Sequence, residues 1–333
     1  MRHARVRPDK EKEKICNITL PLLSVQINVK NAQCVEANHN RAGEAMTDIR
    51  IGFIGLGAMG LPMARNLLKN GYSLHVAVNR NRKPVDELVG LGARELASTD
   101  EVIAGSDCIV AILPADAEME SVLLSDRALA AIRPGQTLIE MTSGTPSMMG
   151  RVADAWQARG ARALDAPVSG GTVGAEQGTL TVMAGGESDV LESVRPVLEA
   201  MSRKIYRVGG IGAGKAIKAI NQMLAAIHMM AAAEAAALAE KLGIDPGILK
   251  EVIGASSGAS WMMANKLDGL ISGQFEPGFK LALMHKDIRI AVSEAGDDLR
   301  LGLARFVLDA YGQAAVRYGE LDFSAISKRI KED

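Results

Sequence analysis

The stretch Ile49-Arg-Ile-Gly-Phe-Ile-Gly55-Leu-Gly57-Ala-Met-Gly60-Leu-Pro62 sets the expected fold of the first half of the chain. Residues 49–54 are a short apolar, β-branched run, typical of a buried parallel strand. Helical periodicity then runs from Pro62 to Asn70. Between them the first glycine permits a tight turn, the second lets the backbone approach a pyrophosphate, and the third lets the helix pack on the strand. The stretch predicts a dinucleotide site at Gly55, Leu56, Gly57, Ala58, Met59 and Gly60; a tight turn without a ligand is the alternative.

Strand-like and helix-like segments alternate through the first half, which implies right-handed crossovers and a parallel sheet. The predicted strands are 49–54, 73–78, 108–113, 137–141, 161–166, 180–184 and 204–208, and the predicted helices are 62–70, 84–91, 98–104 and 117–124. After residue 214 only helical patterns occur, at about 214–242, 246–254, 260–272, 279–295, 299–318 and 324–331. We therefore predict an α/β fold class, with a Rossmann-type parallel-sheet domain followed by an all-α domain.

The 333 residues suit two domains, at roughly 100–200 residues each. We expect an NADP-binding Rossmann domain over residues 46–210 and an all-helical domain for substrate binding and dimerisation over residues 211–333. Residues 1–45 lack a strong pattern and fit neither a signal peptide nor a transit peptide. We interpret them as an N-terminal extension, either disordered or placed upstream of a functional start at Met46.

Composition excludes several classes of partner. The net charge of −1 and the 3% aromatic content argue against nucleic acid and anionic membranes. Polar residues such as Lys218 and Glu234 interrupt the longest apolar stretch, residues 217–242, so no membrane span is expected. Three cysteines fit a reducing compartment, and we expect a cytoplasmic protein. The five histidines lack metal-ligand spacing, and His228 is interpreted as a core residue.

The end of the second predicted strand bears on the choice of cofactor. NAD-binding proteins usually place an acid there for the ribose 2′-hydroxyl, but this chain reads Val78-Asn79-Arg80-Asn81-Arg82-Lys83. The basic side chains suit a 2′-phosphate, so we predict NADP, with Asn79 and Arg80 as binding residues. A solvated basic loop is the alternative, in which case NAD is also accepted.

Four ordered motifs stand out along the chain: Gly52–Ala64, Asp165–Gly171, Gly212–Asn221, and Phe275–Phe279 with Lys286-Asp287 downstream. Together they resemble the β-hydroxyacid dehydrogenases, a family that includes 3-hydroxyisobutyrate dehydrogenase, tartronate semialdehyde reductase and the glyoxylate/succinic semialdehyde reductases. The likeness runs from residue 49 to about residue 331. It implies an oxidoreductase that interconverts a small 3-hydroxy acid and its semialdehyde. One departure concerns the cofactor: the family's Asp-Arg or Asn-Arg pair comes one residue late here, because Val78 occupies its place.

Lys218 is the predicted catalytic residue. Carbonyl reduction needs a hydride from the cofactor and a proton for the developing alkoxide. A lysine desolvated on a helix that enters a cleft has a lowered pKa, which suits proton transfer in both directions. Asn221, three residues on, shares that helix face and is predicted to bind the substrate hydroxyl or to orient the ammonium group. The resemblance implies the same two roles; a surface lysine is the alternative. Lys215 is expected to be a bystander.

Further site residues follow strands. The loop Ser169-Gly170-Gly171 offers backbone N–H groups and a hydroxyl to a substrate carboxylate. Leu113 and Pro114 end a strand and are expected against the adenosine–pyrophosphate side of the cofactor, although a proline that only stops a strand is nearly as good an explanation. The resemblance implies that Ser143 and Lys286 contact the cofactor near the nicotinamide, with Asp287 orienting Lys286. No metal site is predicted.

These expectations leave alternatives within and beyond the enzyme class. A tartronate semialdehyde or glyoxylate/succinic semialdehyde reductase is the first, and an imine reductase on the same fold is the second. A non-catalytic nucleotide-binding relative would keep the glycines and lose Lys218. The long helix at 217–242 exceeds the needs of one small domain, so we expect a homodimer or homotetramer.

Overall fold

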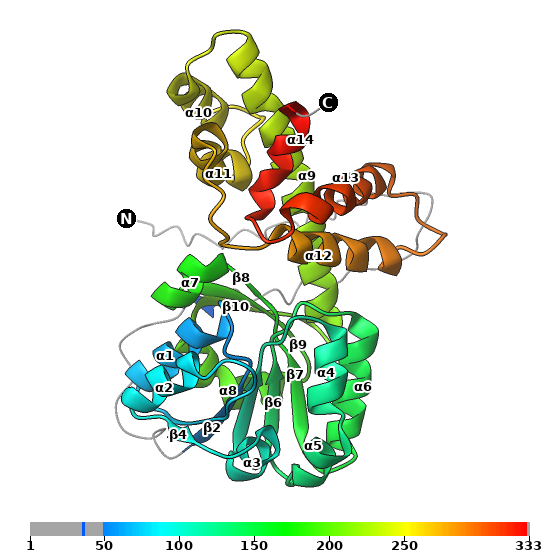
Figure 1. Cartoon of the computed structure of the whole chain (residues 1–333). Coiled ribbons are helices and arrows are strands. Elements are labelled where there is room, and N and C mark those ends of the chain that lie inside the picture. Colours follow the sequence, from blue (N-terminus) through cyan, green and yellow to red (C-terminus); the bar gives the residue numbers. More distant parts are fainter. Residues whose placement is uncertain (1–34, 37–48, 332–333) are drawn as a thin grey trace, which may run out of the picture. The chain divides into compact units, whose positions relative to one another are not determined.

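The computed structural model of the protein describes residues 35–36 and 49–331. Of the predicted N-terminal extension it therefore describes only β1 (Val35–Glu36), which pairs antiparallel with β10 (Ser202–Gly209); the rest of residues 1–45 lies outside the described residues. From residue 49 the chain forms an α/β domain and then a helical domain, as predicted (Figure 1).

A ten-stranded sheet forms the centre of the α/β domain. Besides β1 and β10, its strands are β2 (Arg50–Ile54), β3 (Ser73–Val76), β4 (Arg94–Glu95), β5 (Cys108–Ala111), β6 (Thr137–Glu140), β7 (Arg162–Asp165), β8 (Val168–Ser169) and β9 (Leu180–Gly185). Their spatial order is β1-β10-β9-β7-β6-β5-β2-β3-β4, with β8 paired to β9. The strands from β7 to β4 in this order are parallel, which confirms the expected Rossmann-type parallel sheet.

The last two predicted strands extend the sheet in the opposite direction. β9 meets β7 antiparallel at Asp165 and Gly185, and β10 is parallel to β9. The expectation that residues 180–184 and 204–208 continue a purely parallel sheet is therefore wrong. The link from β7 to β9 explains the reversal, because it passes through β8 and the short helix α7 (Gly171–Gln177) at the end of the sheet that faces the helical domain (Figure 1), and β8 itself pairs antiparallel with β9.

Two layers of helices enclose the sheet. Buried Met63, Leu88 and Val194 come from the helices on one face, and buried Val102 and Trp156 come from those on the other. The first layer contains α1 (Gly60–Lys69), α2 (Lys83–Gly90) and α8 (Ser188–Glu199), and the second contains α3 (Thr99–Gly105), α4 (Asp116–Leu123), α5 (Asp126–Ala131) and α6 (Pro146–Gln157). Helices α5 to α8 were not among the predicted elements.

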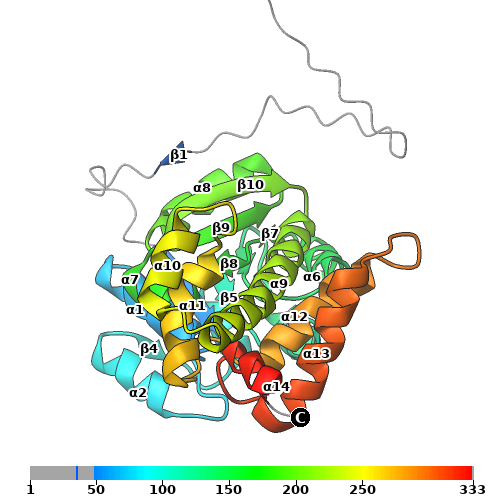
Figure 2. The same cartoon turned by 90° about the horizontal axis from the view of Figure 1, so that it is seen from above.

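The helical domain is built around α9 (Ala213–Lys241). Its other elements are α10 (Pro246–Gly254), α11 (Trp261–Ser272), α12 (Leu281–Glu294), α13 (Gly302–Tyr318), a 3₁₀ turn η2 (Phe323–Ser327) and α14 (Lys328–Lys331). Figures 1 and 2 show α10 and α11 on one side of α9, with α12 and α13 on the other. Met229, Leu267, Met284 and Tyr311 meet in the core between them.

Helix α9 is unusual for its length and composition. It spans 29 residues, and an 18-residue window within it has a mean hydropathy of 1.3. By length and composition alone, such a helix could cross a membrane. Only 33% of the residues in that window are buried. The interpretation of His228 as a core residue is wrong: it is exposed, whereas Ala226 and Met229 on the same helix point into the core.

Candidate active site

The glycine-rich turn after β2 has the geometry that each glycine was expected to provide. Gly55 has a φ of +99°, and a Cβ there would lie 2.0 Å from the Ile112 carbonyl oxygen. A Cβ on Gly60 would lie 1.8 Å from the Gly55 carbonyl oxygen, so only glycine lets α1 begin this close to the turn. A Cβ on Gly57 would meet nothing within 4 Å. The backbone at Gly57 therefore faces open space at the start of a helix, and its contact with a pyrophosphate stays a prediction.

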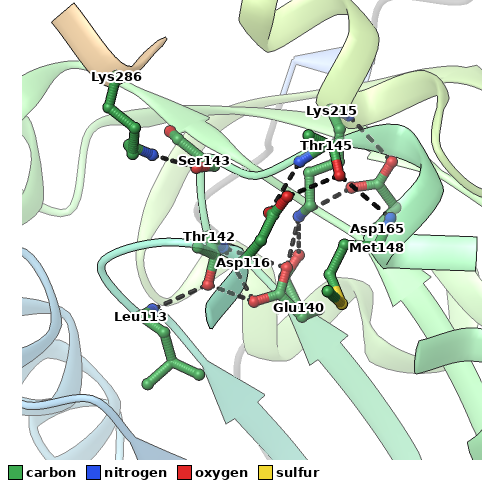
Figure 3. A network of polar contacts seen from close by, with 10 residues as sticks. All are labelled: Leu113, Asp116, Glu140, Thr142, Ser143, Thr145, Met148, Asp165, Lys215 and Lys286. Atoms are coloured by element: carbon green, nitrogen blue, oxygen red, sulfur yellow. Dashed lines mark hydrogen bonds and ion pairs between the residues drawn. The ribbon is translucent and has the colours of Figure 1, made fainter. Parts of the chain in front are cut away.

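Strands β5 and β6, which follow β2 in the spatial order of the sheet, end in loops that are hydrogen-bonded to each other (Figure 3). The Leu113 N–H donates to Thr142 Oγ1 at 2.8 Å, and Thr142 Oγ1 donates to the Glu140 carboxylate. Asp116 accepts hydrogen bonds from the backbone N–H and hydroxyl of Thr145, at 2.9 and 2.7 Å. The predicted cofactor segments Leu113-Pro114 and Thr142-Ser143 thus form one rigid edge beside the glycine turn.

Lys218 lies on α9 and is 9% exposed. Its Nζ donates to Gln222 Oε1 at 3.0 Å, and Gln222 Nε2 donates to Asp287 Oδ2 at 2.9 Å. Asn221 Nδ2 also donates to Gln222 Oε1, at 3.1 Å. A polar chain therefore links α9 to α12. Gln222 was not predicted, although its i+4 spacing from Lys218 was a signal for it.

Burial lowers the pKa of Lys218 to about 8. Asp287 opposes this shift and raises the pKa, while the ammonium group of Lys286 lowers it further. The lowered pKa agrees with the expectation for a lysine desolvated in a cleft. An amine with this pKa exchanges protons readily near neutral pH, which general acid–base catalysis requires.

Lys286 joins the helical domain to the edge of the sheet. Its Nζ donates to the Ser143 carbonyl oxygen and lies 2.8 Å from Asp287 Oδ1. Ser143, Lys218, Gln222 and Asp287 line one small pocket, which Gly144, Lys215, Ala219 and Ile290 complete. The structure thus brings together the residues predicted for proton transfer and for the nicotinamide end of the cofactor.

The predicted carboxylate loop lies outside the lining of that pocket. Gly170 and Gly171 have φ values of +132° and +62°, which glycine adopts without strain. A Cβ on Gly278, in the segment between α11 and α12, would lie 3.9 Å from Thr172 Oγ1, one residue past Gly171. The loop therefore faces the helical domain, and its role in binding substrate stays a prediction.

Lys215 is not the bystander that the sequence suggested. Its side chain is fully buried, 2.5 Å from Glu140 Oε2 and 3.0 Å from Asp165 Oδ1. Burial opposes its charge, but the two carboxylates hold the pKa of Lys215 above its ordinary value. The earlier expectation failed because nothing in the local sequence pairs this lysine with residues 75 and 50 positions away. Glu140 and Asp165, which were not predicted as partners, end strands β6 and β7.

The basic loop after β3 is only partly available to a cofactor. Arg82 forms ion pairs with Glu95 at 2.8 Å and with Asp86 at 2.9 Å. Asn79 and Arg80 are exposed, and no ion pair of Arg80 occurs in the described part of the chain. Of the two arginines expected to favour a 2′-phosphate, Arg80 alone has its charge free of a carboxylate.

These features define a class of protein: a nicotinamide-dependent oxidoreductase with a dinucleotide-binding sheet and a buried lysine on an adjoining helical domain. Residues 50–210 match the family model described as the NAD binding domain of 6-phosphogluconate dehydrogenase. Residues 212–330 match the model described as the NAD-binding domain of NADP-dependent 3-hydroxyisobutyrate dehydrogenase. The chain belongs to the β-hydroxyacid dehydrogenase family, which confirms the resemblance seen in its motifs.

Individual relatives align along almost their whole length. The 2-(hydroxymethyl)glutarate dehydrogenase of Eubacterium barkeri is 40% identical over 285 residues, which cover 84% of this chain and 94% of the relative. The 3-hydroxyisobutyrate dehydrogenase of Pseudomonas aeruginosa is 40% identical over 295 residues, covering 85% and 98%. The solved structure of Mycobacterium tuberculosis 3-hydroxyisobutyrate dehydrogenase with L-serine superposes with a TM-score of 0.78 at 32% identity, covering 85% and 99%. The protein is thus a dehydrogenase acting on the CH–OH group of hydroxyacids with NAD(P).

Proposed function

We propose that the protein interconverts a small 3-hydroxy acid and its semialdehyde, with NADP as the preferred cofactor. The observation that carries this proposal is the buried Lys218, with its pKa of about 8, in a pocket shared with Ser143. The relatives' names supply 3-hydroxyisobutyrate and 2-(hydroxymethyl)glutarate as substrates for oxidation, and the family resemblance supplies tartronate and succinic semialdehydes for reduction. Steady-state turnover of this panel with NADPH and NADH tests the proposal, and no turnover of any member would refute it.

Each residue of the site has a distinct part in this reaction. The bound cofactor supplies or accepts the hydride. Lys218 gives a proton to the developing alkoxide during reduction and takes it back during oxidation. Asn221 holds the substrate hydroxyl, and the Ser169-Gly170-Gly171 loop binds the carboxylate through its backbone N–H groups. Ser143 and Lys286 would hold the nicotinamide end of the cofactor.

Replacing Asp287 with asparagine should move the pH profile of reduction. Reduction needs Lys218 protonated, so wild-type kcat falls as the pH rises through about 8. Asp287 raises the pKa of Lys218, and its neutral replacement leaves burial and Lys286 to lower that pKa further. The midpoint of the alkaline limb should therefore shift below pH 8. A kcat–pH series measures it, with Asp268→Asn on α11, which pairs with Lys250 at the surface, as the control. An unchanged or more alkaline midpoint in Asp287→Asn contradicts this account.

Arg80→Ala should weaken NADPH binding and leave NADH binding almost unchanged. A hydrogen bond to a charged group contributes roughly 1.5–3 kcal/mol, and solvent screening reduces that at an exposed site, so we expect a roughly threefold to tenfold rise in the Kd of NADPH. Arg82→Ala is the matched control, because Glu95 and Asp86 already neutralise that guanidinium. Equal affinity of the wild-type protein for NADPH and NADH would mean that the loop does not select the cofactor.

We also propose that the protein is a cytoplasmic homodimer or homotetramer that binds neither nucleic acid nor membranes. Apolar side chains on α9 support self-association, since Ile217, Ile220, Leu224 and Leu238 are 40–57% exposed in the single chain. Light scattering after gel filtration should give a mass at least twice that of the 35.2 kDa chain. Leu238→Lys, far along α9 from Lys218, should shift the mass toward the monomer, and a monomeric wild-type protein would exclude the proposal.

A further inference from the structure

A buried ion cluster lies between the sheet and the first turn of α9 (Figure 3). Glu140 and Asp165 are the last residues of β6 and β7, and Lys215 is the third residue of α9; none of the three side chains is exposed. Lys215 Nζ also donates to the Glu140 carbonyl oxygen at 3.1 Å. Asp165 Oδ2 accepts the Lys215 backbone N–H at 3.0 Å, so it caps the helix from a neighbouring strand.

Stability alone is a poor explanation for such a cluster. Desolvating an ammonium group and two carboxylates is costly. Replacing such buried charges by well-packed apolar residues of similar volume often leaves the stability of a protein unchanged or raises it by about 1–4 kcal/mol. Charged groups do fix the geometry of the elements that carry them, because each group must meet a partner at hydrogen-bond distance. The cluster therefore indicates that the first turn of α9 must be held in one position against β6 and β7.

The cluster fixes α9 tightly against the sheet. A Cβ on Gly214 would lie 2.4 Å from the Met183 carbonyl oxygen and 2.9 Å from Asp165. A Cβ on Gly185 would lie 2.9 Å from the Gly214 backbone nitrogen. The first turn of α9 thus rests directly on β9 and β7. Lys218 follows Lys215 by three residues, and both line the same pocket.

The same cluster reaches the cofactor edge through Glu140. Its carboxylate accepts the Thr142 backbone N–H at 3.2 and 3.3 Å and also the Thr142 hydroxyl. Thr142 in turn receives the Leu113 N–H and precedes Ser143. A single carboxylate therefore contacts both the anchor of the Lys218 helix and the segment expected at the nicotinamide.

We propose that Lys215 is a positioning residue that holds Lys218 at a fixed distance from the Thr142-Ser143 segment, and so sets the proton donor against the hydride-transfer position. This inference rests on the proposed function. Lys215 acts through geometry: the shifts in the pKa of Lys218 come from burial, Asp287 and Lys286, and the charge of Lys215 is compensated by its own carboxylates.

The test compares Lys215→Met with the double variant Lys215→Met/Glu140→Gln. The single variant leaves two carboxylates without a counter-ion and is at risk of failing to fold. The double variant removes one positive and one negative charge together, and the new glutamine still offers Thr142 an acceptor. Arg133→Met is the control, because it breaks contacts to Asp107 and the Ser106 carbonyl at the opposite, amino-terminal end of the strands.

A displacement of about 1 Å at a reacting group lowers the rate by roughly 10²-fold, so kcat of the double variant should fall by about that factor while KM stays within about threefold. In the cofactor-free protein, amide hydrogen exchange should accelerate in peptides covering residues 137–145 and 211–222 and stay unchanged around α3. Arg133→Met should lower Tm without changing kcat.

Two results would overturn the proposal: kcat of the folded double variant within about threefold of wild type, or exchange that accelerates evenly across the chain. Both are judged against the wild-type protein. If the wild-type protein turns over no substrate of the panel, the proposed function fails, whereas the exchange measurement still decides whether Lys215 positions these two segments.

Discussion

Lys218→Met lowers kcat by roughly 10²–10⁴-fold, the usual contribution of a general acid or base, and leaves the Kd of NADPH within about threefold of the wild-type value. Lys218 contacts Gln222 on α9, whereas the pyrophosphate is predicted to bind at the glycine turn before α1. Its removal therefore takes away the proton donor and spares the main cofactor contacts. Methionine fills the buried space without a charge, so folding is preserved.

The pH dependence gives this prediction a second signature. In the wild-type protein, reduction declines and oxidation rises as the pH passes through about 8, because the two directions need the protonated and the neutral amine respectively. The residual activity of Lys218→Met should lack both limbs. Lys241→Ala, at the exposed end of the same helix, is the control and should behave as wild type. A Lys218→Met protein with kcat within about threefold of wild type would exclude Lys218 as the catalytic residue.

Gly57 and Gly60 of the turn should respond differently to the same added methyl group. Gly60→Ala forces a Cβ to within 1.8 Å of the Gly55 carbonyl oxygen, so the turn must move; overpacking of this kind costs about 1–3 kcal/mol or more. Gly57→Ala meets nothing within 4 Å, and the free protein should keep its Tm. The methyl group then occupies space needed by the pyrophosphate, so the Kd of NADPH should rise by roughly tenfold or more.

Thermal unfolding without cofactor, together with fluorescence titration with NADPH, separates these two effects. Gly60→Ala should lose stability and binding together, whereas Gly57→Ala should lose binding alone. Gly90→Ala on α2, where a Cβ also meets nothing, is the matched control for the added methyl group. A Gly57→Ala protein that binds NADPH as tightly as wild type would place the pyrophosphate somewhere other than this turn.

Much of the fold could be predicted because local patterns coincide with burial. Residues 51–54, with β-branched Ile51 and Ile54, and the apolar residues 108–111 are buried, as strands covered on both faces must be. Helix α10 begins where its pattern begins, since Asp245 caps its start and Pro246 is its first residue. In such elements the local preference and the tertiary environment favour the same structure.

The missed helices show where local patterns were overlooked or interrupted. Helix α6 carries a start signal, with Thr145 accepting the Met148 N–H and Pro146 as the first residue, yet no helix was predicted there. Helix α8 contains Pro196 near its end, and α7 begins at the flexible pair Gly170-Gly171. The reversed direction of β9 follows from the tertiary pairing of β8 with β9, which no periodicity in one segment reveals.

The residues of the candidate site also fall into those that local sequence patterns predict and those that they do not. Lys218, Asn221 and Ser143 are visible in motifs, since each follows a recognisable turn or strand end. Gln222 could have been predicted from its i+4 spacing from Lys218. The pairing of Lys215 with Glu140 and Asp165 joins three distant parts of the chain. The ion pair of Arg82 with Glu95 joins the loop after β3 to strand β4. Long-range partners of charged side chains are the part that sequence spacing does not encode.

Helix α9 has a mechanical consequence. At about 1.5 Å per residue its 29 residues make a rod of roughly 43 Å that starts on the sheet and ends inside the other domain. A conventional linker would let the two domains swing independently, but a shared rod makes the helical domain a lever whose fulcrum is the ion cluster at Lys215. A tilt of that lever would move Lys218, three residues from Lys215, far less than the far end of α9 at Lys241, and Asp287 would move with Lys218 because Gln222 links them. Lys218 would thus keep its place beside the sheet even when the far end of the helical domain moves.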